Sequence, residues 1–384
     1  MKVVVGFMPL LDCASLVVAV ERGFAAQEGL DLRLVRETSW ANIRDRIIVG
    51  HFDAAHMLAP MTIASTLGIG HIKARFIAPI SLGLGGNAIT VSLPLWEWMA
   101  REGAAAGDFT SAQGAALKRV IAARERAGHQ PLTFGMVYPF SCHNYELRYW
   151  LAAAGVDPDR DVRLVVIPPP FLADALREGQ IDGFCVGEPW NSVAVDAGIG
   201  AIVTPTTALW PLSPDKVLGC RAEWAERYPE QLAGLLRTLY RASVWIGQPE
   251  NHAEVAKLLA EPRYVGTSAG LLHRALAGRL ALRPGTEPVP VADFYVPANH
   301  HANFPWVSHA LWLYTQMVRW RQVEFSAEHL AAVRGTCRPD LYRAALSRLD
   351  PDIPSADLKV ERFFDGRGFD PEDPRGWLES GGRS

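Results

Sequence analysis

The stretch MKVVVGFMPLLDCASLVVAVERGF, residues 1–24, decides the fold because it fits two incompatible interpretations. As an export signal, it would combine a charged start and an apolar run with Cys13 as a lipoprotein anchor. As a folded segment, it would be a strand, a loop and a helix. Pro9 interrupts the apolar run and Asp12 directly precedes the cysteine, whereas cleavage sites favour small neutral residues. The stretch therefore favours the folded interpretation.

The following residues complete a strand, helix, strand unit. Residues 3–7 are β-branched and end at a proline turn, as a buried parallel strand does. Residues 15–27 carry apolar side chains at helical spacing and stop at Gly29, and DLRLV at 31–35 alternates as a second strand. A βαβ unit thus starts at residue 1. Because a cleaved leader would remove its first strand, we expect a cytoplasmic protein.

The alternation of strands and helices continues to about residue 220. The pattern predicts helices at 40–50, 60–68, 107–128 and 143–154, with strands between them. From about residue 221 the chain is predicted to be mostly helical, and the polar tail after Asp350 to be loose. Alternating elements indicate parallel-rich sheets that bind ligands at the carboxyl ends of their strands.

Length and composition predict a soluble protein with two lobes. The chain has 384 residues, more than a single core usually holds. A formal charge of −3 leaves no basic footprint for direct nucleic-acid binding, and no apolar run reaches the ~20 residues of a membrane span. Five dispersed cysteines without a C-x-x-C pair are typical of a reducing compartment.

The sequence lacks the common catalytic motifs. It contains no phosphate loop, no G-x-S-x-G elbow and no H-E-x-x-H helix, and LGLGGNA at 82–88 lacks dinucleotide spacing. His300, His301 and His309 have no carboxylate or cysteine at ligand spacing, so surface or packing roles are favoured over a metal. We therefore predict a protein that is not an enzyme and has no cofactor or metal.

Six segments resemble one family in their order along the chain. Together they are similar to the nitrate-binding and bicarbonate-binding solute-binding proteins of bacterial ABC transporters, over nearly the whole length. The segments are TSWANIRDRIIVG at 38–50, SLGLGGNAITVS at 81–92, HNYELRYWLAAAGV at 143–156, CVGEPWNSVAV at 185–195, PDKVLG at 214–219 and PWVSHALWLYTQMVRW at 305–320.

The resemblance implies a two-lobed α/β clamshell of the periplasmic-binding-protein type, type II. Residues 1–85 and 217–384 would form the first lobe and residues 86–216 the second. The chain would then cross between the lobes near Gly86 and near Lys216.

The resemblance also implies an anion site at Trp40, Asn87, His143, Gly187 and Lys216. Nitrate is a planar acceptor with one negative charge, which suits one cation and several neutral donors. Lys216 would supply the charge, and the other four positions would supply N–H groups. Glu188 is expected to hold the turn or hinge, since two negative charges would repel.

Each of these residues also has a structural interpretation. Trp40 could be a core residue, Asn87 a turn former and His143 a helix cap. Lys216 could lie on the surface, and Gly187 could serve only the turn into Pro189. By resemblance, a lysine favours nitrate or nitrite over bicarbonate, whose site is expected to hold calcium, and over sulfonates, which need an apolar pocket.

Two cellular roles compete, and both follow from the resemblance. The favoured one resembles the cytoplasmic nitrate and nitrite sensors of the NasS type, which restrain an RNA-binding antiterminator of nitrate assimilation until the anion arrives. The alternative is an exported nitrate-binding component of an ABC transporter. A transporter ATPase would need a phosphate loop. Thiamine-pyrimidine synthases, enzymes that share the fold, match these motifs poorly.

Overall fold

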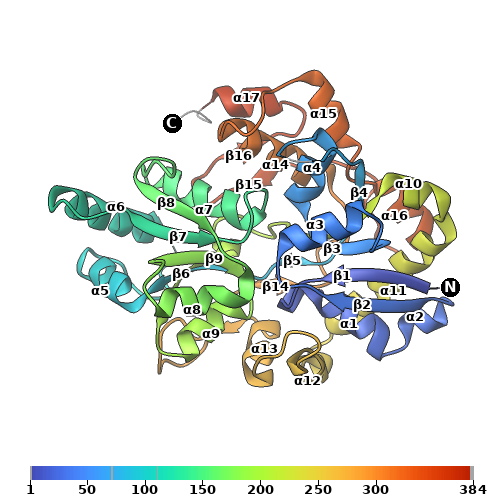
Figure 1. The fold of residues 1–384 in the computed structure, drawn as a ribbon, viewed down its shortest axis with the longest axis horizontal. Helices are drawn as coiled ribbons and strands as arrows, with labels where there is room; N and C mark the ends of the chain where they lie inside the picture. Colours follow the sequence, from blue (N-terminus) through green and yellow to red (C-terminus); the bar gives the residue numbers. More distant parts are fainter. Residues whose placement is uncertain (1, 71, 110, 381–384) are drawn as a thin grey trace.

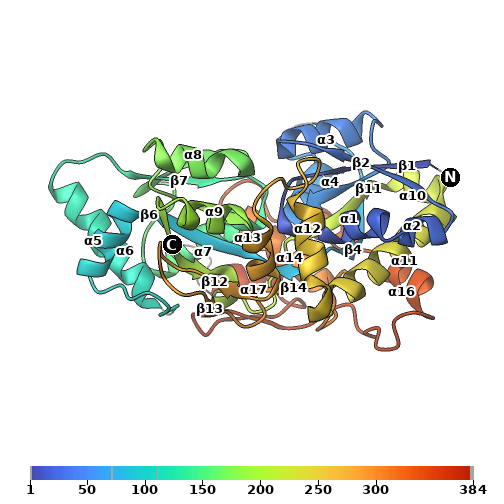
Figure 2. The same ribbon diagram turned by 90° about the horizontal axis from the view of Figure 1, so that it is seen from below.

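Two five-stranded sheets form the centres of two lobes in the computed structural model, which describes residues 2–70, 72–109 and 111–380 (Figure 1). Figure 2, seen from below, shows the lobes side by side along the long axis of the molecule. The α/β clamshell prediction is confirmed.

The first sheet has the strand order β2-β1-β3-β11-β4. β1 pairs in parallel with β2 and β3, whereas β11 runs antiparallel to β3 and β4. The strands are β1 Lys2–Phe7, β2 Asp31–Arg36, β3 Ala54–Leu58, β4 Phe76–Ser81 and β11 Lys216–Arg221. The helices packed around this sheet include α1 Ala14–Glu21, α3 Trp40–Ile48, α4 Ala59–Leu67, α11 Pro229–Ile246, α12 His252–Ala260 and α16 Pro339–Leu346.

The second sheet has the strand order β10-β6-β9-β7-β8, with β6 antiparallel to both of its neighbours. Its strands are β6 Asn87–Ser92, β7 Leu132–Met136, β8 Val162–Val166, β9 Gly183–Gly187 and β10 Gly200–Pro205. The helices of this lobe include α5 Leu93–Arg101, α6 Ser111–Arg126, α7 Cys142–Ala153, α8 Leu172–Arg177 and α9 Trp190–Asp196. Residue 110, inside the predicted helix 107–128, lies outside the described residues.

Strand β1 lies inside the first sheet, between β2 and β3. Val3, Val5 and Phe7 are buried in the core of this lobe, against α1 and α11. Residues 2–7, KVVVGF, thus form a central strand, and their removal would separate β2 from β3.

The chain changes sheets between β5 (Leu84–Gly85) and β6, and again between β10 and β11. The first change uses Gly85 and Gly86, both in the left-handed region, where φ is 72° and 84°. A Cβ on Gly85 would lie 2.3 Å from the Phe294 carbonyl oxygen, so only glycine fits there. The lobe boundaries drawn at residues 86 and 216 remain predictions.

The prediction of a loose tail after Asp350 is wrong for residues 351–380, here called the C-terminal segment; residues 381–384 lie outside the described residues. Phe363, Phe369 and Trp377 of this segment are buried in an aromatic cluster with Trp312 of α14 (Val307–Arg319). The segment contains β15 Glu361–Arg362, β16 Gly368–Phe369 and α17 Pro374–Glu379. Its aromatic residues follow neither helical nor strand spacing, so polar composition alone was misleading.

Candidate functional site

The five predicted site residues meet between the two sheets, at the ends of their elements. Trp40 is the first residue of α3, whose N-cap is Ser39, and His143 lies in the first turn of α7. Asn87 and Gly187 are cross-strand partners at the start of β6 and the end of β9. Lys216 begins β11. Ligand sites of α/β sheets typically form in this position.

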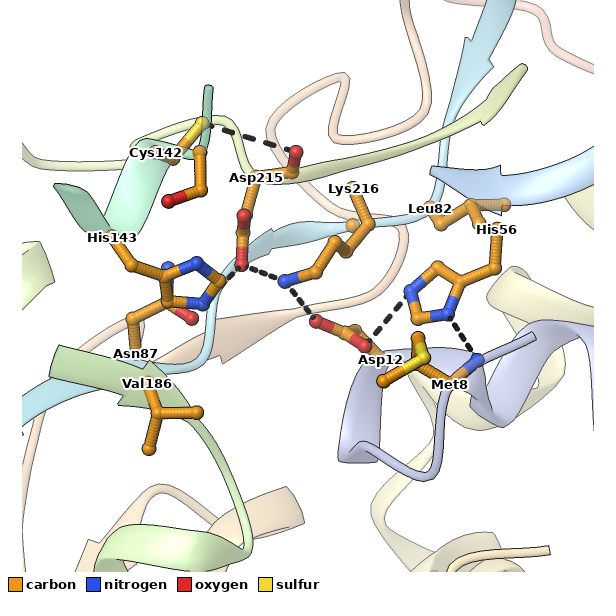
Figure 3. A network of polar contacts seen from close by, with 12 residues as sticks. Met8, Asp12, His56, Leu82, Asn87, Cys142, His143, Val186, Asp215 and Lys216 are labelled. Carbon is orange, nitrogen blue, oxygen red and sulfur yellow. Dashed lines mark hydrogen bonds and ion pairs between the residues drawn. The ribbon is translucent and has the colours of Figure 1, made fainter. Parts of the chain in front are cut away.

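Lys216 lies at the centre of the site, held by two carboxylates (Figure 3). Its Nζ donates to Asp12 Oδ2 at 3.0 Å and also contacts Asp215 Oδ2. The lysine is only 1% exposed and Asp215 2%. Lys216 is therefore a paired cation, because an isolated buried ammonium would be costly and the fold supplies its partners. Its role as the cation for an anion remains a prediction.

His56 orients Asp12 from the other side. The Met8 N–H donates to His56 Nδ1 at 3.3 Å, and His56 Nε2 lies 3.0 Å from Asp12 Oδ1. Because Nδ1 accepts a hydrogen bond, Nε2 is the nitrogen that carries a proton toward the carboxylate. We name Asp12, His56, His143, Asp215 and Lys216 the central cluster.

His143 and Glu146 approach the cluster from α7 of the second lobe. His143 Nε2 lies 3.5 Å from Asp215 Oδ2, and the Asn87 side-chain amide donates to Glu146 Oε2 at 3.5 Å. Both α7 side chains are buried. The site therefore gathers groups of both lobes, because Asp12 and His56 come from the first lobe whereas Asn87, His143 and Glu146 come from the second.

Trp40 and Gly187 complete the enclosure. Lys216 Nζ lies 5.6 Å from the centroid of the Trp40 ring, and His56 packs against that ring edge to face. A Cβ on Gly187 would lie 3.2 Å from Asn87 Oδ1 and 3.7 Å from Asp12 Oδ2. A side chain at position 187 would thus fill the space between the Asn87 amide and Asp12.

Burial and charge pairing set the protonation of the site. Burial tends to raise the pKa of Asp12, but Lys216 and His56 hold it well below its usual range. Burial tends to lower the pKa of Lys216, but Asp12 and Asp215 keep it above its usual range. Burial lowers the pKa of His143 to about 4 and, with the charge of Asp215, raises that of Glu146 to about 8. At neutral pH, His143 and Glu146 are therefore uncharged.

Several buried polar atoms around the cluster have no hydrogen-bond partner among the described residues. They include the donor Trp40 Nε1, both ring nitrogens of His143 and the oxygens Asn87 Oδ1, Glu146 Oε1 and Asp215 Oδ1. Buried polar groups in folded proteins are nearly always paired. Their convergence indicates a place for a small polar ligand that both donates and accepts hydrogen bonds.

The structure also decides between several structural interpretations. Ser141, not His143, caps α7 by accepting from the Asn144 N–H. Lys216 is buried rather than on the surface, and Asn87 begins a strand rather than a turn. Trp40 does belong to a hydrophobic core, while its Nε1 stays unpaired.

Glu188 holds the junction between the lobes, as predicted. Its N–H donates to the Gly86 carbonyl, its carbonyl accepts from the Leu11 N–H at 2.8 Å, and its side chain accepts from the Ser192 N–H.

Sequence reasoning missed four residues of the site: Asp12, His56, Glu146 and Asp215. Asp12 follows a buried strand, at the position where α/β folds place ligand-contacting groups, and this was the available signal. Within residues 2–70, 72–109 and 111–380, no group of three or more His, Cys, Asp or Glu side chains is placed to hold a metal ion. In the same residues, no helix has the length and apolarity that a bilayer crossing requires.

Comparisons with known proteins agree with this architecture. The NMT1-like family matches residues 1–260. The nitrate/nitrite binding protein NrtA of Synechococcus elongatus is 34% identical over 98% of this chain and 85% of its own length. The bicarbonate transport ATP-binding protein CmpC of Synechocystis is 35% identical over 97% of this chain. The chain spans about half the length of the ATP-binding relatives it matches, 54% in each case.

A solved structure shares the whole fold. The crystal structure of the periplasmic nitrate-binding protein NrtA from Synechocystis superposes with a TM-score of 0.91 at 29% identity. The match covers 99% of this chain and 98% of that one.

Proposed function

The chain belongs to the NMT1-like family, among the nitrate-binding and bicarbonate-binding solute-binding proteins, and from that premise we propose that it binds nitrate or nitrite at the central cluster. The proposal rests on Trp40 Nε1 and the ring nitrogens of His143, which are buried without a hydrogen-bond partner among the described residues, beside the ion pairs of Lys216. Lys216 Nζ lies 5.6 Å from the centroid of the Trp40 ring, and His143 Nε2 lies 3.5 Å from Asp215 Oδ2. A planar anion needs one cation and donors around its plane, and these groups supply both.

The charges of the cluster define how an anion enters. One ammonium already serves two carboxylates, so an added anion would leave the buried cluster with excess negative charge. His143 is a group able to offset that charge, because it is neutral at pH 7, its ring nitrogens have no hydrogen-bond partner among the described residues, and it lies beside Asp215. We infer that the anion takes over a contact of Lys216 while His143 gains a proton.

Bicarbonate is a second candidate ligand, favoured by one specific observation. Asp215 Oδ1 is a buried acceptor without a hydrogen-bond partner among the described residues, and bicarbonate has an O–H group that nitrate lacks. That hydroxyl could donate a hydrogen bond to Asp215, which would reduce the repulsion between ligand and carboxylate without a proton from the buffer. The relatives named for nitrate and for bicarbonate are equally similar to this chain.

Calorimetry with nitrate, nitrite and bicarbonate tests the binding proposal. A four-atom ligand at about 1.5 kcal/mol per atom reaches about 6 kcal/mol, or tens of micromolar. Trp40→Phe keeps the ring and removes the N–H donor, so affinity for the anion should fall about tenfold or more. An unchanged affinity in this variant would show that Trp40 is only a core residue. Absence of heat with all three anions would reject the proposal.

Proton exchange separates the two candidate ligands. The same titration is repeated in buffers that differ in ionisation enthalpy. The protein should take up a proton from the buffer when nitrate binds. It should take up little or none when bicarbonate binds. Equal proton uptake for both ligands would contradict the assigned role of Asp215.

The cellular role divides into transport and sensing. Delivery to a permease is supported by the relatives, whose names describe nitrate binding and bicarbonate transport. Cytoplasmic sensing, with release of an RNA-binding antiterminator, is supported by the cysteines: all five are free, and four of them are buried. In either role, ligand binding across the two lobes would stabilise the closed form.

Purification of the untagged protein from its native host separates the two roles. A sensor should copurify with an RNA-binding protein that leaves when nitrate or nitrite is added. A transport component should instead be recovered from the periplasm without such a partner. A partner indifferent to every anion would sink the sensor role.

A further inference from the structure

A second charged cavity lies on the opposite side of α7 from the central cluster. Its volume is about 510 Å³, and it lies between the end of α14, helix α17 and the turn that follows α7. In Figure 1, α17 of the C-terminal segment lies at the top of the molecule, above α14 and α7. We name it the arginine cavity, after Arg319, Arg321 and Arg375 in its lining.

The positive and negative side chains that line this cavity do not balance. Asp159 in the lining pairs with Arg148 at 2.7 Å, and Asp157 lies 3.9 Å from Arg160. By contrast, the three arginines of the lining form no ion pair with any described carboxylate. Glu379 is the remaining acid of the lining and has no described partner either. The unpaired groups therefore sum to about two positive charges.

Aromatic rings position the guanidinium groups. Arg319 lies 4.7 Å from the centroid of the Trp320 ring and 5.5 Å from that of Tyr149, while Arg375 lies 5.1 Å from that of Phe325. Stacking orients a planar guanidinium and leaves its N–H edge free to bind an anion. Arg319 Nε and Nη1 are buried and have no hydrogen-bond partner in the part of the chain that the structure describes. Because buried donors in folded proteins are nearly always hydrogen-bonded, these atoms indicate a ligand with acceptor oxygens.

The geometry points to a binding site for the phosphate group of a small organic phosphate. A phosphate monoester carries nearly two negative charges and three acceptor oxygens on one group, which matches two excess positive charges and three arginines. A single carboxylate has two oxygens and one charge. The volume lies within the range of small-molecule sites and exceeds what a four-atom anion fills, so the central ligand is not the expected occupant.

The site joins segments that are distant in sequence. Tyr149 of α7 donates its hydroxyl to Asp365 at 2.8 Å, and the hydroxyl of Tyr145 donates to Gln322 at 2.7 Å. The lining itself includes Asp157 and Asp159 of the second lobe and Arg375 of the C-terminal segment, so an occupant would contact both. We expect it to raise the melting temperature, because it binds only the folded arrangement.

Calorimetry on the full chain tests this site with pyrophosphate, adenosine monophosphate and glucose 6-phosphate as probes, and with succinate as a dicarboxylate. At least one phosphate should bind saturably, and succinate more weakly. Arg375→Gln and Arg321→Gly should each weaken phosphate binding about tenfold or more, with nitrate binding unchanged. Both residues are exposed, so folding should persist.

Arg33→Gln is the matched control, since it removes one exposed positive charge from β2 of the first lobe. Its phosphate affinity should equal that of the wild type. Equal weakening in all three variants would indicate nonspecific attraction and overturn the site. The absence of saturable phosphate binding, or succinate binding as tight as that of the phosphates, would also overturn it.

Discussion

The central cluster and the arginine cavity manage positive charge in opposite ways. Lys216 is 1% exposed and is held by two carboxylates, whereas Arg321 and Arg375 are exposed and form no ion pair with a described residue. Water solvates the exposed charges, but a buried ammonium must be paired before any ligand arrives. A ligand of the cluster must therefore replace an existing ion pair, while a ligand of the cavity displaces only water.

Removing the central charge should give the largest effect. Lys216→Met leaves Asp12 and Asp215 buried without their cation, and should lower the free energy of unfolding by about 3–5 kcal/mol. Anion binding should disappear. Urea unfolding and calorimetry measure both effects.

The double variant Lys216→Met, Asp215→Asn is the control. It should recover part of the stability and none of the binding. If Lys216→Met lowered the free energy of unfolding by less than about 1 kcal/mol, the charges of the central cluster would be solvated by water, like those of the arginine cavity.

The buried acid Glu146 should make stability fall as pH rises. Its pKa is about 8 in the folded protein and 4.5 in the unfolded chain, so the folded state holds the extra proton. The protonated Glu146 contributes fully to the free energy of unfolding below pH 4.5. Between pH 4.5 and pH 8 this contribution is lost, by up to about 1.4 kcal/mol per pH unit.

His143 has the opposite effect on stability, because its pKa falls from 6.5 in the unfolded chain to about 4 in the fold. It therefore changes the free energy of unfolding with pH only below pH 6.5. The measurement is therefore the difference in unfolding free energy between wild type and Glu146→Gln from pH 6.5 to 8. Parallel pH profiles of the two proteins would show that Glu146 is ionised in the fold.

Nitrate affinity should also depend on pH. If the anion binds together with a proton on His143, affinity falls as pH rises above about 4, the pKa of His143 in the ligand-free fold, by up to about tenfold per pH unit. Titrations at pH 6.5, 7.5 and 8.5 measure this slope. Phosphate binding in the arginine cavity should vary less above pH 7, because arginine stays charged. A flat nitrate profile would contradict proton uptake at His143.

Removing one carboxylate should leave the central cluster with a partly unpaired positive charge, as in the arginine cavity. Asp215→Asn keeps the shape and frees part of the Lys216 charge, so nitrate affinity should rise about tenfold and its pH dependence should shrink. Calorimetry at pH 7.5 measures both. Weaker nitrate binding would instead assign Asp215 a direct role, as the bicarbonate alternative requires.

The smallest effect is expected at the cavity wall. Arg321 has a φ of 57°, which glycine adopts without strain. Arg321→Gly should therefore leave stability unchanged or raise it by about 0.5 kcal/mol. Glu324→Gly, at a neighbouring exposed position without positive φ, should instead lose about 0.5–1 kcal/mol. Thermal unfolding compares the two. A larger loss at Arg321 would show that its side chain supports the fold.

Much of the fold was predictable because it depends on local pattern. The β-branched run at 3–7 and the helical spacing after it follow from neighbouring residues, and they form β1 and α1. Ser39 and Ser141 begin their helices by local capping. The residues carried over by resemblance, such as Trp40 and His143, do meet in space. The C-terminal segment was not predictable, since its aromatic residues pack against partners far away in sequence.

By itself, the sequence determined the α/β alternation, the strand at residues 2–7 and the residue types available to an anion. Only the tertiary structure decided how their charges combine. Asp12 and Lys216 are 204 residues apart, and no periodicity shows that they form an ion pair. Burial then sets the protonation of His143 and Glu146, because the cost of a charge depends on the surroundings that the whole fold supplies.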